Sequence, residues 1–287
     1  MDSQRIANMA QQQPDRLRTH EQRAIADATR PLATAIADAQ KAAVTRWVRE
    51  TIGRQIPAQL DNLVTWLRDL LRTAFAGKGR QAQAAAEQAA FTAAHTSAQQ
   101  AATLAAAMRG QPTPPVAVEP GGDAQQAAAR IPAAVAEEQG HALALLTTAG
   151  LTAMGLAGLN SVFKRARRAI SRIASGTAVA ITSAAAHGAR LVAKALGKGI
   201  RLLWVAEPDA CAACRAYAGH HIKPGGKFPG GLTLDPRRTA FPDAIPGPPR
   251  HPHCRCVLIP WSPSWRLTGT PLPTLLRQRA RHAWRSP

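Results

Sequence analysis

All four cysteines of the chain lie in two close pairs, and a histidine accompanies the second pair. Cys211 and Cys214 form C-x-x-C in "EPDACAACRAYAG", and Cys254 and Cys256 form C-x-C in "PPRHPHCRCVLIP". Paired thiolates at such spacings are typical zinc ligands, because two sulfurs from one short turn can bind one tetrahedral ion. His251, three residues before Cys254, offers a competing ligand. The sequence therefore predicts a structural Zn²⁺ site drawn from these five residues, and leaves open which four bind the ion.

Disulfide bonds and a redox-active C-x-x-C are two other possible uses of the cysteines. The first residues, "MDSQRIANMAQQQPDR", lack the apolar core of a signal peptide, so a reducing compartment is expected, where disulfides are disfavoured. A redox-active C-x-x-C would need a thioredoxin-like strand and helix, and would leave the second pair unexplained. A zinc ion whose coordination positions are all filled by protein ligands is structural rather than catalytic, because no position is left for water.

The segments around the cysteines must bring the two pairs together. Residues 208–250 are rich in Pro and Gly and are predicted to be a loop, which metal binding would order. Strands are predicted at "IRLLWVA" (200–206) before this loop and at "CRCVLIPW" (254–261) after it. On the second strand, Cys254 and Cys256 would face the same side because side chains repeat with period two.

The remainder of the chain is predicted to be helical. The clearest helix is 57–77, with Pro57 as a start signal, Gly77 as a stop signal and leucines on one face. Residues 81–108 are Ala-rich, and 171–199 form one or two helices that end at Gly197 and Gly199. Residues 141–160 contain no Asp, Glu, Lys or Arg; they are expected to form a buried helix of a bundle rather than a membrane span, so no membrane partner is expected.

These elements predict a mainly α protein, with an extended helical N-terminal region and a C-terminal helical module whose small β-element is clasped by zinc. The expected organisation is a helical region at 1–110, a Pro/Gly linker at 111–125, a zinc-clasped module at 126–262 and a basic tail at 263–287. The end of the tail, "TLLRQRARHAWRSP", could lie on phosphates or be a frayed end.

The net charge of +19 is concentrated in the second half of the chain. Residues 151–287 hold 21 of the 36 Lys and Arg but only four acidic residues, which gives a charge of about +17. A coding bias would enrich Arg, Ala and Pro, but it would not place the charge in one half. Such a charge predicts non-specific binding to DNA. The candidate contacts are Lys164, Arg165, Arg167, Arg168, Arg277, Arg279 and Arg281.

Two resemblances to known families bear on function. The stretch "GHHIKPGG" resembles the His-His-Ile-x-Pro turn of His-Asn-His endonucleases, which implies His221 as general base and His220 as a metal neighbour. That family also has an Asn in the following loop, whereas the asparagines here are Asn8, Asn62 and Asn160, all outside it. A zinc-framed nuclease is therefore the alternative function.

A closer resemblance is to the Mu F-like minor head proteins of tailed phages, also called head morphogenesis proteins. It is carried by the Arg-Ile-Ala-x-x-Thr helix, a strand ending in Trp-Val-Ala, the D-x-C-x-x-C knuckle and the closing "PPRHPHCRC", and it covers residues 126–260. The resemblance implies a non-enzymatic component of the virion interior, assembled in the host cytoplasm and acting at the portal vertex. Its implied partners are the portal protein, other capsid or scaffold proteins and DNA.

Overall fold

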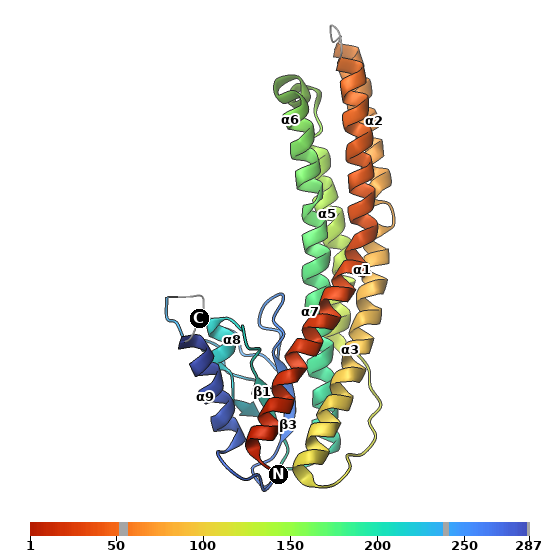
Figure 1. The fold of residues 1–287 in the computed structure, drawn as a ribbon. Coiled ribbons are helices and arrows are strands. Elements are labelled where there is room, and N and C mark those ends of the chain that lie inside the picture. The colour runs from red at the N-terminus through yellow and green to blue at the C-terminus, as the bar shows by residue number, and fades with distance from the viewer. Residues whose placement is uncertain (52–56, 238–240, 286–287) are drawn as a thin grey trace. The chain divides into compact units, whose positions relative to one another are not determined.

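The computed structural model describes residues 1–51, 57–237 and 241–285, and these residues are mainly helical with one small sheet (Figure 1). The helices are α1 (Ser3–Thr51), α2 (Pro57–Phe75), α3 (Lys78–Arg109), α4 (Gly122–Ala129), α5 (Ile131–Ala144), α6 (Thr148–Ala166), α7 (Arg168–Ala195), α8 (Ala212–Ala216) and α9 (Leu272–Arg285). The strands are β1 (Arg201–Val205), β2 (His221–Ile222) and β3 (Val257–Trp261). The predicted mainly α class with a small β-element is confirmed at this level.

The chain divides into two compact units that interleave along the sequence. Unit 1 contains residues 1–23, 87–127 and 178–287, and unit 2 contains residues 24–86 and 128–177. The long helices α1, α3 and α7 each contribute residues to both units. The compact units therefore do not follow consecutive segments such as 1–110 and 126–262.

Unit 2 is a bundle in which α2, α5 and α6 pack on one another and on parts of the long helices. The predicted apolar face of α2 is buried at Leu60, Leu63, Val64, Leu67, Leu71, Ala74 and Phe75, while Leu70 is half-buried. In the unit 2 part of α1, the buried residues are mostly small and recur every three or four positions. They are Ala24, Ala28, Leu32, Ile36, Ala39, Ala43 and Trp47. This spacing keeps one stripe of the helix in the core.

The apolar stretch 141–160 does not form the single buried helix that the sequence predicts. Helix α5 ends at Ala144, and α6 begins after Thr147, whose side chain accepts a hydrogen bond from the Gly150 amide. A kink follows at Gly155, where φ is 54°. Leu159 is buried, but Met154 is 55% exposed. Thr147 is an effective N-cap, so it starts a new helix inside the apolar run.

One helical stretch in the described part of the chain, Thr148–Ala195, has the length and composition to cross a membrane. In the structure, 61% of its most apolar window is buried by other parts of the protein. The core helices of soluble proteins share these properties, so this finding is weak evidence for a span.

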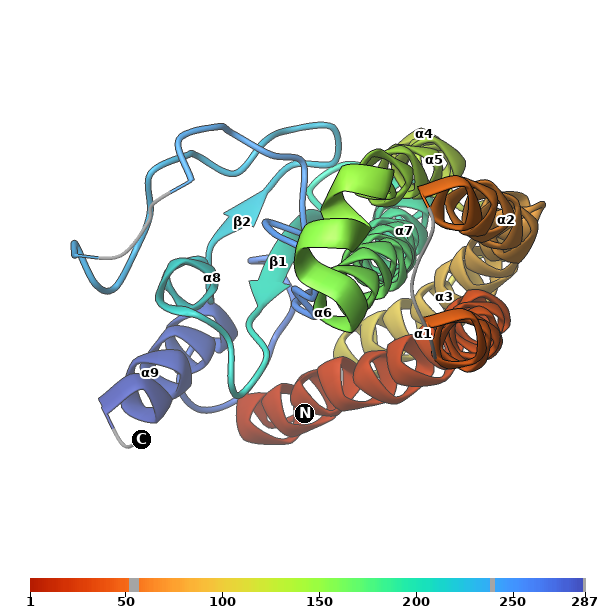
Figure 2. The ribbon, with the colours of Figure 1, turned by 90° about the horizontal axis from the view of Figure 1, so that it is seen from above.

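Unit 1 contains an antiparallel sheet of order β2-β1-β3, with Leu203 of β1 opposite His221 of β2 and Ile259 of β3. The sheet lies between α7 and α8 (Figure 2). Ala186 and Ala189 of α7 and Trp204 of β1 belong to one buried cluster. The apolar side chains of this cluster hold the sheet and the cysteine segments together.

Three local predictions in this region need correction. The segment 208–250 is not loop throughout, because it contains the short helix α8 and strand β2, which pairs with β1. The strand β3 begins at Val257, so Cys254 and Cys256 lie before it. The tail is not frayed over the described residues to 285, because Leu272 and Leu276 of α9 are buried. Gly219 permits this packing, since a Cβ there would meet the Pro273 carbonyl oxygen at 2.0 Å.

The predicted linker is also packed. Residues 111–121 have no helix or strand, as predicted, but Val116 and Val118 pack against the core of unit 1. Gly121 has φ +83° and lies against the ring of His187. Helix α4 begins at the next residue.

Candidate metal centre

The C-x-x-C pair is held by the turn that starts α8. Cys211 is the N-cap of this helix, with extended backbone angles, and its Sγ accepts a hydrogen bond from the Cys214 amide at 3.5 Å. This geometry turns both sulfurs toward the same side of the turn. Arg215 fixes the turn to the preceding segment by donating to the carbonyls of Pro208 (2.7 Å) and Ala210 (2.6 Å).

The closing segment brings His251 and the C-x-C pair to this knuckle. The His251 Nε2 lies 3.3 Å from the sulfurs of both Cys211 and Cys214. The other ring nitrogen, Nδ1, is 2.8 Å from the Pro252 carbonyl oxygen, to which it donates. A backbone acceptor for one ring nitrogen orients the other toward the metal, as in many metal-binding histidines. The Cys254 Sγ lies 3.6 Å from the Cys214 Sγ.

The five predicted ligands form two overlapping groups of three. Cys211, Cys214 and His251 form one group, and Cys214, Cys254 and Cys256 form the other; the donor atoms within each lie within 4.8 Å of one another. Tetrahedral zinc with Zn–S bonds of about 2.3 Å requires sulfurs about 3.8 Å apart. The observed separations of 3.3–3.6 Å between donor atoms are close to this edge length. Each group is therefore close enough to bind a metal ion, and Cys214 is common to both groups.

The protonation of these donors is strongly coupled. The hydrogen bond from the Cys214 thiol, with one from His251, lowers the pKa of Cys211 to about 4. Its thiolate in turn raises the pKa of His251 to about 9. The hydrogen bond between Cys214 and Cys211 raises the pKa of Cys214. The hydrogen bond between Cys214 and Cys254 lowers the pKa of Cys254. The hydrogen bond with Cys214 lowers the pKa of Cys256, but the hydrogen bond with Cys254 and burial have the larger combined effect, so the pKa of Cys256 is raised overall. A bound cation would replace the shared protons.

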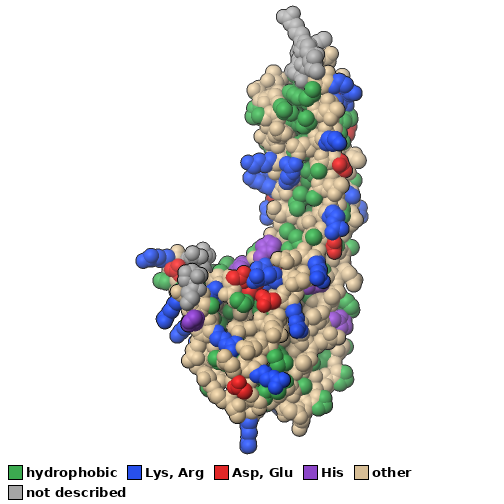
Figure 3. Space-filling model, viewed as in Figure 1, with side chains coloured by type: hydrophobic (Ala, Val, Ile, Leu, Met, Phe, Trp, Pro, Cys, Tyr) green, Lys and Arg blue, Asp and Glu red, His purple; other side chains and the backbone are tan. Residues whose placement is uncertain are grey.

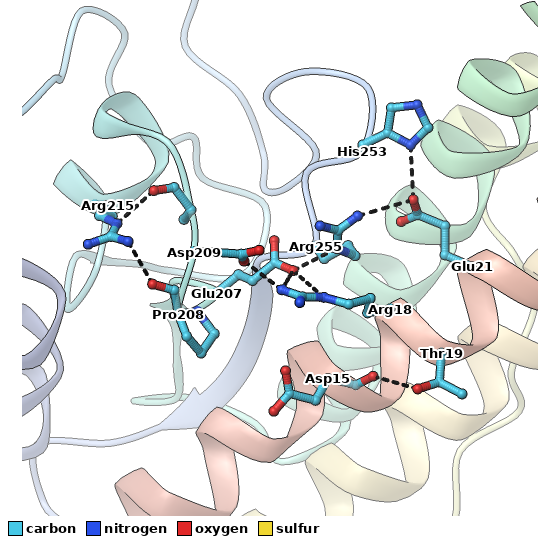
Figure 4. Close-up of polar contacts among 11 residues, drawn as sticks. Asp15, Arg18, Thr19, Glu21, Glu207, Pro208, Asp209, Arg215, His253 and Arg255 are labelled. Atoms are coloured by element: carbon cyan, nitrogen blue, oxygen red, sulfur yellow. Dashed lines mark hydrogen bonds and ion pairs between the residues drawn. The ribbon is translucent and has the colours of Figure 1, made fainter. Parts of the chain in front are cut away.

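A cluster of charged side chains supports the closing segment from α1 (Figure 4). Arg255, which lies between Cys254 and Cys256, donates to Glu207 at 2.6 Å and reaches Glu21 of α1 at 3.4 Å. Glu21 also contacts the His253 ring at 3.0 Å. The two glutamates are 2% and 5% exposed. They are partnered buried carboxylates, so they hold the cysteine segment against α1.

Arg18 of α1 completes this cluster. Its guanidinium contacts Glu207 and the exposed Asp209, both at 2.5 Å. Burial raises the pKa of Glu207 above its ordinary value, although hydrogen bonds from Arg255 and Arg18 oppose the shift. The hydrogen bond to Glu207 raises the pKa of Arg18. Sequence reasoning missed Arg18, Glu21 and Glu207, because no local pattern links α1 to a segment more than 180 residues away.

The structure does not join His220 and His221 in a metal site. His221 lies on β2, where its Nδ1 is 3.3 Å from Arg201 and its ring lies 5.1 Å from that of Trp261. His220 packs near Tyr217. Burial lowers the pKa of both histidines. Among the residues that the structure describes, neither belongs to a group of three possible metal ligands.

The seven predicted DNA contacts divide between the units. In unit 2, Lys164, Arg167 and Arg168 are exposed, whereas Arg165 contacts the buried Glu138 at 2.9 Å. In unit 1, Arg279 bonds Asn8 and Gln11, Arg277 donates to the Gly219 carbonyl, and Arg281 is exposed. On the face drawn in Figure 3, Lys and Arg side chains are scattered over the surface, and Asp and Glu side chains lie beside some of them.

Comparison with known proteins assigns no family to this chain. No protein-family model, no curated protein and no solved structure matches it.

Proposed function

We propose that this chain is a structural minor head protein of a tailed phage, in which a metal ion, most simply Zn²⁺, clasps the C-terminal module. The observation that carries the proposal is the convergence of the C-x-x-C knuckle and the "HPHCRC" closure on one buried donor cluster. The order of strand, knuckle and closing segment is the feature that resembles Mu F-like proteins. The role inferred is in head assembly at the portal vertex, with portal, capsid or scaffold proteins as partners.

The burial of the donors supports a structural ion over a catalytic one. Cys214, Cys254 and Cys256 are at most 2% exposed, and His251 and Cys211 are partly covered. A catalytic zinc keeps a coordination position open to water or substrate, whereas four of these five donors are enough to fill a tetrahedral ion. The ion would then contribute to folding by fixing residues 208–250 between β1 and β3.

The charge distribution supports a position close to DNA. Residues 151–287 carry about +17, which would be strongly attracted to packaged DNA inside a capsid. The nuclease alternative gains no comparable support, because His220 and His221 lie outside both donor groups. We therefore carry only the structural function forward.

The experiment compares matched variants for metal content and for head assembly in the phage that encodes the chain. Cys214→Ser removes the donor common to both groups, and His251→Asn removes the histidine donor. Cys214→Ser is expected to lose the zinc of the wild type, roughly one ion per chain, and to yield no filled heads. Loss of zinc from His251→Asn would place His251 among the four ligands, whereas retention would assign all four to the cysteines. His253→Asn is the control, because its ring contacts Glu21 and belongs to neither donor group.

His221→Ala separates the structural function from the nuclease. It is expected to retain zinc and to assemble heads, and the wild type is expected to cleave no DNA. A folded wild type that contains no metal would contradict the clasp. Normal heads from Cys214→Ser would contradict the role in assembly.

A further inference from the structure

A basic groove lies in unit 1 at the end of α7, outside the metal centre. It has a volume of about 810 Å³ and is lined by Lys194, Lys198, Arg201 and Lys223 together with Ser262 and Ser264. The lining comes from three segments: the end of α7 with the turn into β1, the residue after β2, and the turn after β3. None of these residues is among the DNA contacts predicted from the sequence.

The groove presents cations that no carboxylate neutralises. Lys194, Lys198 and Lys223 are exposed, and Arg201 is half-exposed. Within the described residues, none of the four makes an ion pair, and no lining residue is acidic. Of the four acidic residues after position 150, Glu207 and Asp209 pair with Arg18 at the other end of β1. The uncompensated charge makes the groove attractive to a polyanion.

The polar lining suits phosphate oxygens. Ser264 is exposed, and its amide and hydroxyl contact the hydroxyl of the buried Ser262 at 3.3 and 2.9 Å, which holds the Ser264 side chain at the groove. Hydroxyls and ammonium groups are common contacts to the phosphates of nucleic acids. The volume exceeds what a single phosphate would need, and the cations are spread over three segments, so an extended chain of phosphates fits better than a single anion.

An aromatic pair adjoins the groove. Arg201 is opposite Trp261 in the sheet, and His221 is opposite Leu203, so Arg201, His221 and Trp261 lie on one face. Their contacts agree: Arg201 donates to His221 at 3.3 Å, and the His221 ring lies 5.1 Å from the Trp261 ring. Both rings are partly exposed. Aromatic rings next to a cationic groove are the combination on which unpaired bases stack.

A purely structural reason explains only part of this arrangement. Lysines at the end of a helix interact favourably with its dipole, which would account for Lys194 and Lys198 at the end of α7. It does not account for Arg201 on β1 or for Lys223 after β2, which approach the same groove from the sheet.

We propose that the basic groove binds the backbone of single-stranded nucleic acid, with bases stacking on the His221 and Trp261 side of the sheet. Phosphates contact the three lysines, Arg201 and the exposed Ser264 hydroxyl. Sequence selectivity is not expected, because these contacts reach the backbone and the faces of the bases. The inference is independent of the role in head assembly, since it concerns binding by the purified chain.

The test measures binding of a fluorescein-labelled oligothymidine to the metal-loaded full chain by fluorescence anisotropy. The groove variant is Lys194→Gln/Lys198→Gln/Lys223→Gln. The control, Arg5→Gln/Arg237→Gln/Arg285→Gln, removes the same charge from exposed positions of unit 1 outside the groove. The groove variant is expected to bind roughly tenfold more weakly at 0.1 M salt, and its log K against log salt slope should fall by about 2, near 0.7 per lost phosphate contact. The control is expected to bind within about twofold of wild type.

Trp261→Leu tests the stacking, with an expected loss of about fivefold or more in affinity, whereas Trp261→Phe retains a ring and should bind nearly normally. If Trp261→Leu does not fold, the quenching of tryptophan fluorescence by the oligonucleotide is compared between wild type and Trp261→Phe, which should show less quenching. Equal losses in the groove and control variants would overturn the site, as would the absence of binding. Tighter binding to a duplex of the same length would overturn the preference for a single strand.

Discussion

At the scale of single residues, His251 and His187 show how backbone contacts determine what a histidine can do. The His251 Nδ1 donates to the Pro252 carbonyl, which points Nε2 at two sulfurs. His187 instead is half-buried beside Gly121, and its buried Nε2 has no hydrogen-bond partner among the residues that the structure describes. The His251 ring can release a proton and bind a metal ion instead, whereas protonation of the His187 ring would destabilise the folded protein.

We predict that His187 makes unit 1 less stable in mild acid. Burial, assisted by Arg190, lowers the pKa of His187 below its ordinary 6.5. The unfolded chain therefore binds this proton more readily, and the free energy of unfolding falls as the pH drops below about 6.5 toward the lowered folded pKa. His187→Gln should show a smaller fall than wild type in denaturant titrations at a series of pH values.

The control for this prediction is His282→Gln, which changes an exposed histidine of α9. It should retain the wild-type dependence on pH. A wild-type pH dependence in His187→Gln would show that other groups cause the acid sensitivity. His220 and His221, whose pKa values are also lowered by burial, would then be the next candidates.

At the scale of elements, the helices of unit 1 pack closely because their contact residues are small. The ideal Cβ of an alanine at Gly188 in α7 would lie 2.3 Å from the Ala94 carbonyl oxygen of α3. The two backbones are thus in contact at this point, and Ala98 and Ala101 of α3 continue the contact with α7. Backbones approach this closely only when no side chain stands between them.

We therefore predict that Gly188→Ala destabilises the protein, although alanine is the better helix former. The two helices must separate, at a cost of roughly 1–3 kcal/mol. Gly140→Ala is the matched control, because Gly140 is exposed in α5 and an added Cβ would meet nothing within 4 Å. It should stabilise by about 0.5–1 kcal/mol. Thermal unfolding of both variants tests the contact, and stabilisation by Gly188→Ala would contradict it.

The charged cluster between α1 and the closing segment leads to another prediction at this scale. Glu207 accepts from Arg18 and Arg255 while only 5% exposed. Glu207→Gln should cost roughly 3 kcal/mol, because two partly buried arginines lose a counter-charge that lies in the interior. Asp209→Asn removes a carboxylate from the same Arg18, but its side chain is 57% exposed, so a cost below about 1 kcal/mol is expected.

Urea unfolding of the metal-loaded variants measures the two costs. The difference between the two costs measures the effect of burying the carboxylate, since both substitutions replace an acid by its amide. Equal costs would show that the cluster behaves as an ordinary surface network. The contacts from α1 would then contribute little to the stability of the cysteine segment.

At the scale of the whole molecule, the chain folds into two units that are stabilised in different ways. Unit 2 buries apolar stripes of α1, α2, α5 and α6 and contains none of the cysteines. Unit 1 includes the segment 208–250, whose described parts have little helix or strand and meet the closing segment at the donor cluster. Its order should therefore depend on the ion.

Metal removal is predicted to affect the units unequally. After treatment with a chelator, amides of β1, α8 and residues 251–261 should lose protection in hydrogen exchange, as should residues 3–23 of α1. Amides of α2, α5 and α6 should change little, because their core contains no metal ligand. Equal loss of protection in both units would show that they unfold as one cooperative body.

The sequence by itself identified the residues of the two donor groups and most of the helices. Spacing shows that cysteines in pairs can bind one ion, and the repeat of apolar residues in 57–75 indicates a helix with a buried face, because both signals are local. Gly77, Gly110 and Gly197 likewise follow the ends of helices with positive φ, as a stop signal requires.

Tertiary structure alone decided the remaining features. Nothing near Cys254 in sequence indicates that Arg255 would pair with Glu21, or that Lys223 would share a groove with Lys194, because these contacts depend on how distant segments pack. The course of 141–160 differs, because there two local features, Thr147 as N-cap and Gly155 at a kink, outweighed the continuous apolar composition. Local patterns name the groups that can do chemistry, while long-range contacts decide which of them meet.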